Sequence, residues 1–558
     1  METAEPSNAT SVTEAVTTNL SSTPLPMETE VAPLSGWMSK FARNSAANVF
    51  RLVVTSLIGI LLPAYLTHHL PVATYGAWVL VLQLGAYVGY LDFGVQTAIA
   101  KYIAEFEARQ DFEGCGRCAS AGFMIILAAS AIGILLTGVL AWRVPELFRN
   151  MPANLQGEAR YAIVLVGVSL SISLAASVFS AIFLGLQRYE IPMMTTVATR
   201  LLYASALGIA VATHSSLVVM GAAVAAANVA GAALQVGFWK RLAPHIGINL
   251  RAIDFTMLRR MLEYCAILTI WSMCMLFITG IDVTVVGHYA FSEVAFYSIA
   301  TAPTTLILTV IGALLGPLLP AASALSVERS SREMGAILLR TTRYSTLILL
   351  VTGLPLMMAG YELLRLWVGR DYALHSIRFL QILLLANILR NLCGPYATMV
   401  VALSRQRVAT AAAITEAAVN LASSIWLARH YGAMGVALGT LIGSATGVTM
   451  HFGISMGYTQ VNFAIPRFRL LAGGIVRPAS MAIPSALLLP MWWRSGPPSL
   501  TPALWIGWAI STGSLAWLVS LSRDERALLK QVITKRMTFA MRRTYGNDSS
   551  QTERHRHK

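Results

Sequence analysis

The chain has 558 residues, of which 56% are hydrophobic and 12% are charged, and its formal net charge is +15. Soluble globular domains carry about a quarter charged residues, so this composition excludes a set of water-soluble domains. The mean hydropathy is +0.63, and apolar runs of about 20 residues, each long enough to cross a bilayer as a helix, recur along the chain. A transmembrane barrel is excluded because its strands would alternate in polarity.

The apolar runs predict an all-α polytopic membrane protein with about fourteen transmembrane helices. The expected spans are 46–66, 75–95, 117–142, 160–186, 191–213, 215–239, 263–287, 293–322, 342–360, 375–401, 408–428, 432–458, 470–491 and 501–521.

Both ends of the chain are predicted to be cytoplasmic tails. Residues 1–36 are rich in Ser, Thr, Pro and Glu, contain no Lys or Arg and lack the apolar core of a signal peptide, which predicts disorder. Residues 523–558 are basic and could either contact anionic membrane lipids or simply fix the topology. An even helix number places both termini on one side, and inner loops then hold roughly 17 Lys and Arg against 7 outside. The dispersed charge, without a nucleic-acid-binding motif, indicates topology and no nucleic-acid partner.

An internal repeat is visible in two pairs of short segments. Pro71–Gly76 is similar to Glu293–Ser298, and Met220–Ala223 is similar to Met434–Ala437. The offsets, 293 − 71 = 222 and 434 − 220 = 214, nearly agree. They predict two pseudo-symmetric six-helix lobes, the N-lobe at 37–241 and the C-lobe at 242–460, followed by two additional helices at 461–522. Two such lobes with substrate between them are typical of alternating-access transporters.

Ionisable residues deep inside apolar spans are functional candidates because a charge in hydrocarbon costs at least about 2.5 kcal/mol. Arg200, Arg390 and Glu416 lie deepest. Asn387 and Asn391 share a helix face with Arg390, and Asn420 shares one with Glu416. These residues could form an interhelical ion pair. Alternatively, the arginines could hold an anionic group such as phosphate while Glu416 couples transport to a proton or cation.

Three more charges lie near the membrane faces. Arg51 could reach a cavity or anchor its helix at the headgroups. Asp92 and Asp282 could bind a cation or proton, cap a helix, or pair with an arginine. Cys115 and Cys118 form an isolated C-x-x-C pair, so neither a metal site nor a cofactor is expected.

Five segments between residues 45 and 460 stand out in order along the chain. They are Tyr90–Val95 with Lys101–Glu105, Ile281–Gly287, Leu366–Gly369, Glu416-Ala417 with Asn420-Leu421, and Tyr431–Thr440. Together they resemble the bacterial oligosaccharide flippases, the Wzx-like polysaccharide transporters of the multidrug/oligosaccharidyl-lipid/polysaccharide exporter superfamily.

The resemblance implies a transporter, not an enzyme, that moves polyprenyl-pyrophosphate-linked oligosaccharide across the bacterial inner membrane for surface polysaccharide synthesis. It implies a cationic cavity, with which the arginines agree, and a proton or sodium gradient that drives the cycle. It also suggests a polysaccharide polymerase and chain-length machinery as partners. The final two helices resemble the extra pair of some fourteen-helix relatives.

Three other functions remain open from the residues. A multidrug exporter of the same superfamily would carry cavity acids without balancing arginines. An integral-membrane glycosyltransferase or polymerase would need a large external loop with catalytic groups, whereas the outer loops here look short. A scaffold for polysaccharide synthesis would leave the repeat and the buried charges unexplained.

Overall fold

A computed structural model describes residues 34–250, 254–315, 331–403, 406–457 and 463–483, with isolated positions 318, 322, 507, 508, 511, 514, 526 and 527. Every regular element in the described ranges is helical. The elements are α1 (Leu34–His69), α2 (Val72–Ala86), η1 (Tyr87–Asp92), α3 (Val95–Ala108), α4 (Phe112–Leu147), α5 (Ala153–Gly185), α6 (Glu190–Ala212), α7 (Leu217–Leu242), α8 (Phe255–Met275), η2 (Leu276–Gly280), α9 (Asp282–Tyr289), η3 (Phe291–Glu293), α10 (Val294–Leu315), α12 (Ser331–Met358), α13 (Gly360–Val368), α14 (Arg370–Leu392), α15 (Gly394–Ala402), α16 (Gln406–Met450), η4 (His451–Ser455), α18 (Arg467–Leu471) and η5 (Ala472–Val476).

The helices are those of a multi-pass membrane protein. Ten helices in the described residues are long and apolar enough to cross a bilayer, and a bent pair, Phe255–Ala266 with Leu268–Gly280, raises the number to eleven. One of the ten, Ala409–Ser455, contains two of the predicted spans. The predicted span 501–521 lies almost wholly outside the described residues, and 470–491 is described only to residue 483.

Two helix boundaries differ from the predictions. α1 begins at Leu34, so the end of the predicted disordered segment 1–36 and the stretch before residue 46 are helical. Lys101, expected in an inner loop, lies on α3, which continues to Ala108. Hydropathy marks where a chain leaves the lipid, whereas Ala, Lys, Arg and Glu favour continuation of the helix into water.

The predicted break between the spans 408–428 and 432–458 is a single residue. Gly432 has φ +56°, a left-handed conformation that glycine adopts without steric cost. The break frees the backbone N–H of Ala433, which donates to Glu293 Oε2 at 2.8 Å. A helix start inside α16 is therefore capped by a side chain from η3.

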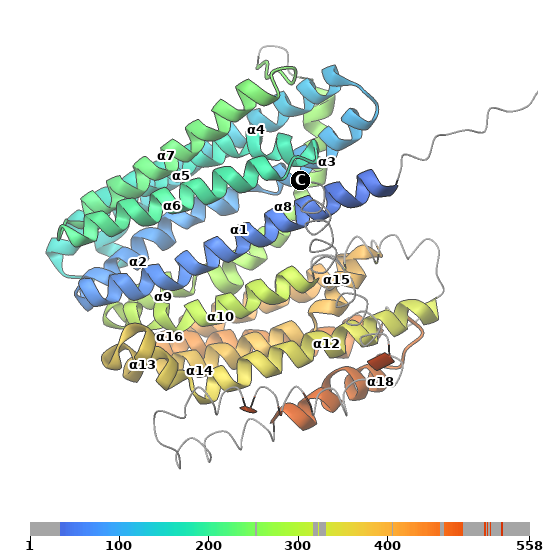
Figure 1. Ribbon diagram of the computed structural model, residues 1–558. Coiled ribbons are helices and arrows are strands. Elements are labelled where there is room, and N and C mark those ends of the chain that lie inside the picture. Colours follow the sequence, from blue (N-terminus) through green and yellow to red (C-terminus); the bar gives the residue numbers. More distant parts are fainter. Residues whose placement is uncertain are drawn as a thin grey trace, which may run out of the picture. The chain divides into compact units, whose positions relative to one another are not determined.

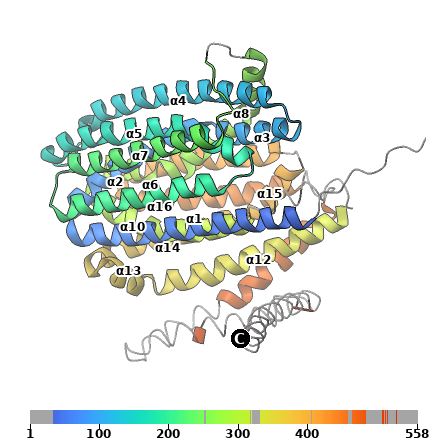
Figure 2. The same cartoon turned by 45° about the horizontal axis from the view of Figure 1, so that its top comes forward.

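Residues 47–483 are described below as an N-half (47–250) and a C-half (254–483). Helices α4 to α7 lie together, as do α12, α14 and α16 (Figures 1 and 2). One apolar core joins the two halves, because Trp78 and Phe148 belong to the same buried cluster as Tyr297 and Phe379. The opposite helix ends have two further cores, one around Ile99 and Ile182 that also includes Met257 and Met261 of α8, and one around Met334 and Met399 in the C-half.

Polar bonds also cross between the halves. Gln83 Nε2 on α2 donates to the Gly280 carbonyl at 2.5 Å, and Tyr87 is hydrogen-bonded to Thr284. Trp367 Nε1 donates to the Ile60 carbonyl at 2.8 Å. These bonds connect α1 and α2 to the C-half beside the shared apolar core.

Candidate functional site

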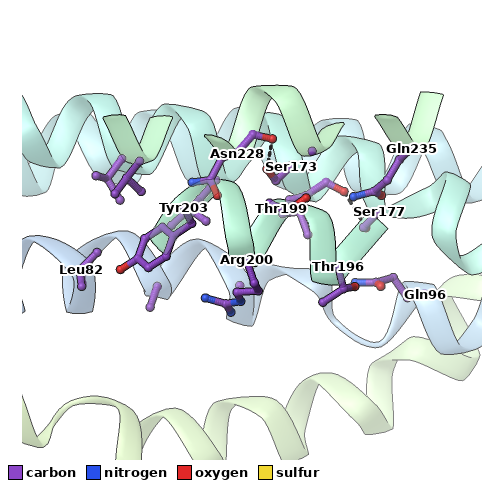
Figure 3. Close-up of a pocket in the computed structure, with 17 residues that line it drawn as sticks. Leu82, Gln96, Ser173, Ser177, Thr196, Thr199, Arg200, Tyr203, Asn228 and Gln235 are labelled. Carbon is purple, nitrogen blue, oxygen red and sulfur yellow. Dashed lines mark hydrogen bonds between the residues drawn. The ribbon is translucent and has the colours of Figure 1, made fainter. Parts of the chain in front are cut away.

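A pocket of about 500 Å³ lies within the N-half, between α2, η1, α3, α5, α6 and α7 (Figure 3). Each helix turns one face to it, as shown by the spacing of Asn228, Gly231 and Gln235 on α7 and of Thr196, Thr199 and Arg200 on α6. The volume is in the range of small-molecule sites, about 300 to 1,000 Å³. The pocket therefore has room for a ligand.

The pocket wall changes character along the helices. Near the shared apolar core it is lined by Leu82, Val166 and Val224. Farther along it is lined by side-chain hydroxyls and amides. These polar residues are Gln96, Ser173, Ser177, Thr196, Thr199, Asn228 and Gln235.

Arg200 is the cation among the described lining residues, and no described carboxylate lies within ion-pair distance of it. Its side chain is exposed. In Figure 3 the guanidinium lies on the opposite side of the pocket from Asn228 and Ser173, and the Tyr203 ring centroid is 6.0 Å from it. A guanidinium can bind a carboxylate or phosphate through two parallel hydrogen bonds, so this pocket suits a ligand with an anionic group.

The second group of predicted residues forms a polar network in the C-half. Arg390 Nε on α14 donates to Glu416 Oε1 on α16 at 2.5 Å, and the two side chains are only 15% and 10% exposed. Arg390 Nη1 also donates to Asn387 Oδ1 at 3.2 Å. The interhelical ion pair, one of the two arrangements predicted, is therefore present between Arg390 and Glu416 and does not include Arg200.

Asn420 lies one helical turn after Glu416 on α16 and bonds η2, a turn of π-helix. Its Nδ2 donates to the Ile278 carbonyl at 2.7 Å, and its Oδ1 accepts from Ser424 Oγ at 3.0 Å. Asn420 is fully buried. A π-turn leaves carbonyls without their usual helical partners, and here Ile278 bonds the C-half while Gly280 bonds the N-half.

Asp282, the first residue of α9, is 7% exposed. Its Oδ2 accepts from Thr440 Oγ1 at 3.1 Å and from Tyr297 OH at 3.4 Å. Its Oδ1 is buried and has no partner among the described residues. Arg390 is close enough to interact electrostatically with this carboxylate.

The other predicted residues lie outside the pocket and the polar network, although two of them are bonded to a member of one of these groups. Arg51 is exposed on α1. Asp92 ends η1 and accepts a bond at 3.1 Å from Gln96, which itself lines the pocket. Asn391 donates to the carbonyl of Asn387, within its own helix, at 2.8 Å.

Neutral residues of both groups escaped prediction. Asn228 and Gln235 carry no charge, so nothing in the sequence marks them as functional. Thr440 is likewise neutral, and its hydroxyl lies 3.1 Å from the Val436 carbonyl, a contact that threonines in helices commonly make. Tyr297 and Thr440 do fall in segments that show the repeat or the family resemblance. All five cysteines are buried and free, and the described residues contain no group of three His, Cys, Asp or Glu side chains that could hold a metal.

The sequence matches, over residues 41–326, the model of a family described as polysaccharide biosynthesis protein. The chain belongs to this polysaccharide biosynthesis protein family. The match includes Arg200 and Asp282, whereas Arg390 and Glu416 lie beyond it. No curated protein matches this family member.

Solved structures show the fold of this polysaccharide biosynthesis protein. The lipid II flippase MurJ in an inward closed conformation is 12% identical, with a TM-score of 0.65, and 85% of this chain covers 99% of that one. An inward-facing MATE family multidrug resistance transporter of the MOP superfamily is 17% identical, with a TM-score of 0.59 and coverage of 75% and 95%. A MOP superfamily transporter from Pyrococcus furiosus is 18% identical, with a TM-score of 0.55 and coverage of 78% and 96%. The fold is that of the MOP superfamily.

Proposed function

We propose that this protein is a flippase that moves a polyprenyl-pyrophosphate-linked oligosaccharide across the bacterial inner membrane for surface polysaccharide synthesis. The observation that carries the proposal is Arg200, an arginine without a described acidic partner in a polar pocket. Family membership supports a substrate in polysaccharide biosynthesis, and the likeness in fold to a lipid II flippase agrees with a lipid-linked one.

The chain is proposed to work by alternating access between two six-helix lobes, 37–241 and 242–460. The proposal also includes two extra helices at 461–522, much of which lies outside the described residues, fourteen helices in all and two cytoplasmic tails. Gly76 of the repeat supports the pseudo-symmetry, because a β-carbon there would lie 3.6 Å from the backbone nitrogen of its counterpart segment's Ala295.

Arg390 is proposed to act within the coupling network and not as a ligand of the pyrophosphate. Its charge is matched by Glu416 in a buried pair, so binding a phosphate would leave Glu416 without its counterion. Asn387 and Asn391 lie on the same face of α14 as Arg390, and Asn387 orients Arg390 by accepting a hydrogen bond from its guanidinium.

Asp282 is proposed to bind the coupling ion, a proton or sodium. Asp282 and Glu416 carry two negative charges against one positive charge on Arg390, which leaves one negative charge in a buried cluster. A buried uncompensated charge is costly, so one proton or monovalent cation balances the set. Thr440 has one hydroxyl proton for two acceptors, Asp282 Oδ2 and the Val436 carbonyl, so it cannot fully satisfy both oxygens and a cation or proton at Asp282 would supply the missing positive charge.

The remaining candidates have supporting roles in this proposal. Asn420, one turn after Glu416 on α16, is bonded to the π-turn η2, whose Gly280 carbonyl is bonded to Gln83 of the N-half. A change at Asp282 or Asn420 can thereby reach the contact between the halves. Asp92 orients Gln96 at the pocket, and Arg51 meets the substrate or the headgroups near the inner end of the span Asn48–His69 within α1. Anionic lipids, a polymerase and the chain-length machinery are the proposed partners.

The main alternative is a cation-coupled multidrug exporter of the same fold. A cationic drug calls for an acidic pocket, whereas the described lining residues of the N-half pocket include Arg200 and no Asp or Glu. An integral-membrane glycosyltransferase or polymerase is a further alternative, and sugar transfer to product in a purified preparation would distinguish it.

The test is a gene deletion in the native host, complemented by wild type, Arg200→Ala or the matched control Arg160→Ala, an exposed arginine on α5 that does not line the pocket. We expect lipid-linked oligosaccharide to accumulate on the cytoplasmic leaflet in the deletion and in R200A, and to be exported with wild type and R160A at equal membrane levels. If the deletion strain instead kept its surface polysaccharide and became more sensitive to cationic drugs, the flippase proposal would be wrong and the drug exporter would be favoured.

A further inference from the structure

The polar wall of the N-half pocket consists mainly of hydrogen-bond acceptors. Ser173, Ser177 and Thr199 use their single protons on backbone carbonyls, those of Asn228 at 3.2 Å, Leu174 at 2.7 Å and Thr195 at 2.7 Å. A hydroxyl whose proton is engaged offers only oxygen lone pairs to a ligand. These three residues therefore accept bonds from whatever occupies the pocket.

Two lining amides are oriented in the same way. Asn228 Nδ2 donates to Ser169 Oγ at 3.0 Å, and Gln96 Nε2 donates to Asp92 Oδ1 at 3.1 Å. Their carbonyl oxygens, Asn228 Oδ1 and Gln96 Oε1, have no described partner and remain acceptors, while each NH₂ group keeps a second N–H as a donor. Gln235 is reversed, since its Oε1 accepts from Ser180 at 3.0 Å and its NH₂ group remains a donor.

A ligand for this wall must bring many O–H or N–H donors of its own. A sugar does so, because each hydroxyl of the ring is a donor as well as an acceptor. A cationic amphiphile brings few donors and would meet the Arg200 charge, while a simple inorganic anion would bind Arg200 and leave the acceptors without partners. Tyr203 adds an aromatic side chain to the apolar part of the pocket.

We infer that the N-half pocket binds the first, uncharged sugar of the substrate, the one attached to the pyrophosphate, with Arg200 holding the adjoining phosphate. This inference rests on the proposed function and adds to it the substrate group that the pocket recognises. The first sugar is assigned because the polar wall and Arg200 line one pocket of about 500 Å³. An uncharged sugar is assigned because Arg200, the cation among the described lining residues, is engaged by the phosphate.

Thr196 and Gln235 are then specificity residues. Thr196 lines the pocket and its hydroxyl makes no hydrogen bond within the described part of the chain, so its loss leaves the fold intact. Its neighbour Thr195 is fully buried and donates to the Ile191 and Pro192 carbonyls. Thr196→Val and Thr195→Val therefore remove the same group from adjacent positions, one inside the pocket and one outside it.

The test measures binding to purified full-length protein in detergent. The two probes are undecaprenyl pyrophosphate and the same lipid carrying one N-acetylglucosamine. We expect wild type to bind the glycosylated lipid about ten-fold more tightly than the bare lipid, and T196V and Gln235→Leu each to lose about two- to ten-fold of that difference. T195V should keep the whole difference, and Arg200→Ala should weaken both lipids by the same factor.

The outcomes separate the inference from the proposed function. The inference is overturned if wild type binds both lipids equally. It is also overturned if T196V and Q235L keep the full preference for the glycosylated lipid at an unchanged melting temperature. In either case the pocket does not recognise the sugar, while the proposed role of Arg200 stands. If wild type binds neither lipid, the proposed flippase function is overturned and this inference with it.

Discussion

Thr440 on α16 donates a hydrogen bond of 3.1 Å to the carboxylate of Asp282 on α9, across 158 positions of sequence. Both side chains are buried, at 2% and 7% exposure, and the second carboxylate oxygen has no partner in the described residues. A buried carboxylate with one oxygen that lacks a hydrogen-bond donor is a site where a proton or sodium ion would be stabilised. The proposed coupling mechanism centres on this pair.

Asp282→Asn should abolish the dependence of transport on an ion gradient. The amide keeps the size of the carboxylate but carries no charge, so no cation is needed to balance it. In proteoliposomes, transport of lipid-linked sugar by wild type should respond to an imposed sodium or proton gradient, and transport by D282N should not. Thr440→Val should weaken the response, whereas Ser444→Ala, which removes a buried hydroxyl bonded to the Thr440 carbonyl, should leave it intact. An ion response that D282N retains would contradict the assignment.

Removing Arg390 from the Arg390–Glu416 pair should destabilise the protein by about 3–5 kcal/mol, because Glu416 is left as a buried, uncompensated charge. Arg390→Met should therefore lower the melting temperature in detergent, and Glu416→Gln should lower it less, because Arg390 still interacts with Asp282. The double variant should recover most of the loss, since it contains neither charge. If the loss of stability in the double variant equals the sum of the losses in the two single variants, Arg390 and Glu416 do not interact as the ion pair between α14 and α16.

Arg200→Lys should retain part of the export activity, and Arg200→Gln should retain about a tenth or less. Lysine keeps the charge that attracts phosphate but lacks the planar fork that binds two oxygens at once. The amount of surface polysaccharide in the complemented deletion strain measures the export activity of each variant. Equal activity of R200Q and wild type at equal expression would remove Arg200 from the transport path.

Gly335→Ala should lower stability by about 1–3 kcal/mol through overpacking. A β-carbon at Gly335 on α12 would overlap the carbonyl oxygen of Phe463, where the segment 463–483 packs against α12. A matched change at Gly312, where a β-carbon would have nothing within 4 Å, should be neutral. The difference in melting temperature between G335A and G312A measures this contact, and its absence would show that 463–483 does not pack there.

The sequence by itself determined the class of protein and many of the spans, because hydropathy is a local property summed over about 20 residues. It also drew attention to Arg200, Asp282 and Glu416, since a charge inside an apolar run is costly wherever the run lies. It placed the start of α1 and the end of α3 wrongly, because a helix continues past the membrane surface without an apolar signal.

The tertiary structure decided which charges meet. The sequence left Arg200 and Arg390 as equivalent candidates, yet packing of α14 against α16 pairs Arg390 with Glu416 and leaves Arg200 in a pocket without a described acid. Thr440, Asn228 and Gln235 became candidates only through their neighbours, because a neutral polar residue inside a helix carries little local signal. A hydrogen bond depends on two groups meeting in space, and that meeting is set by helix packing over separations such as the 158 positions between Asp282 and Thr440.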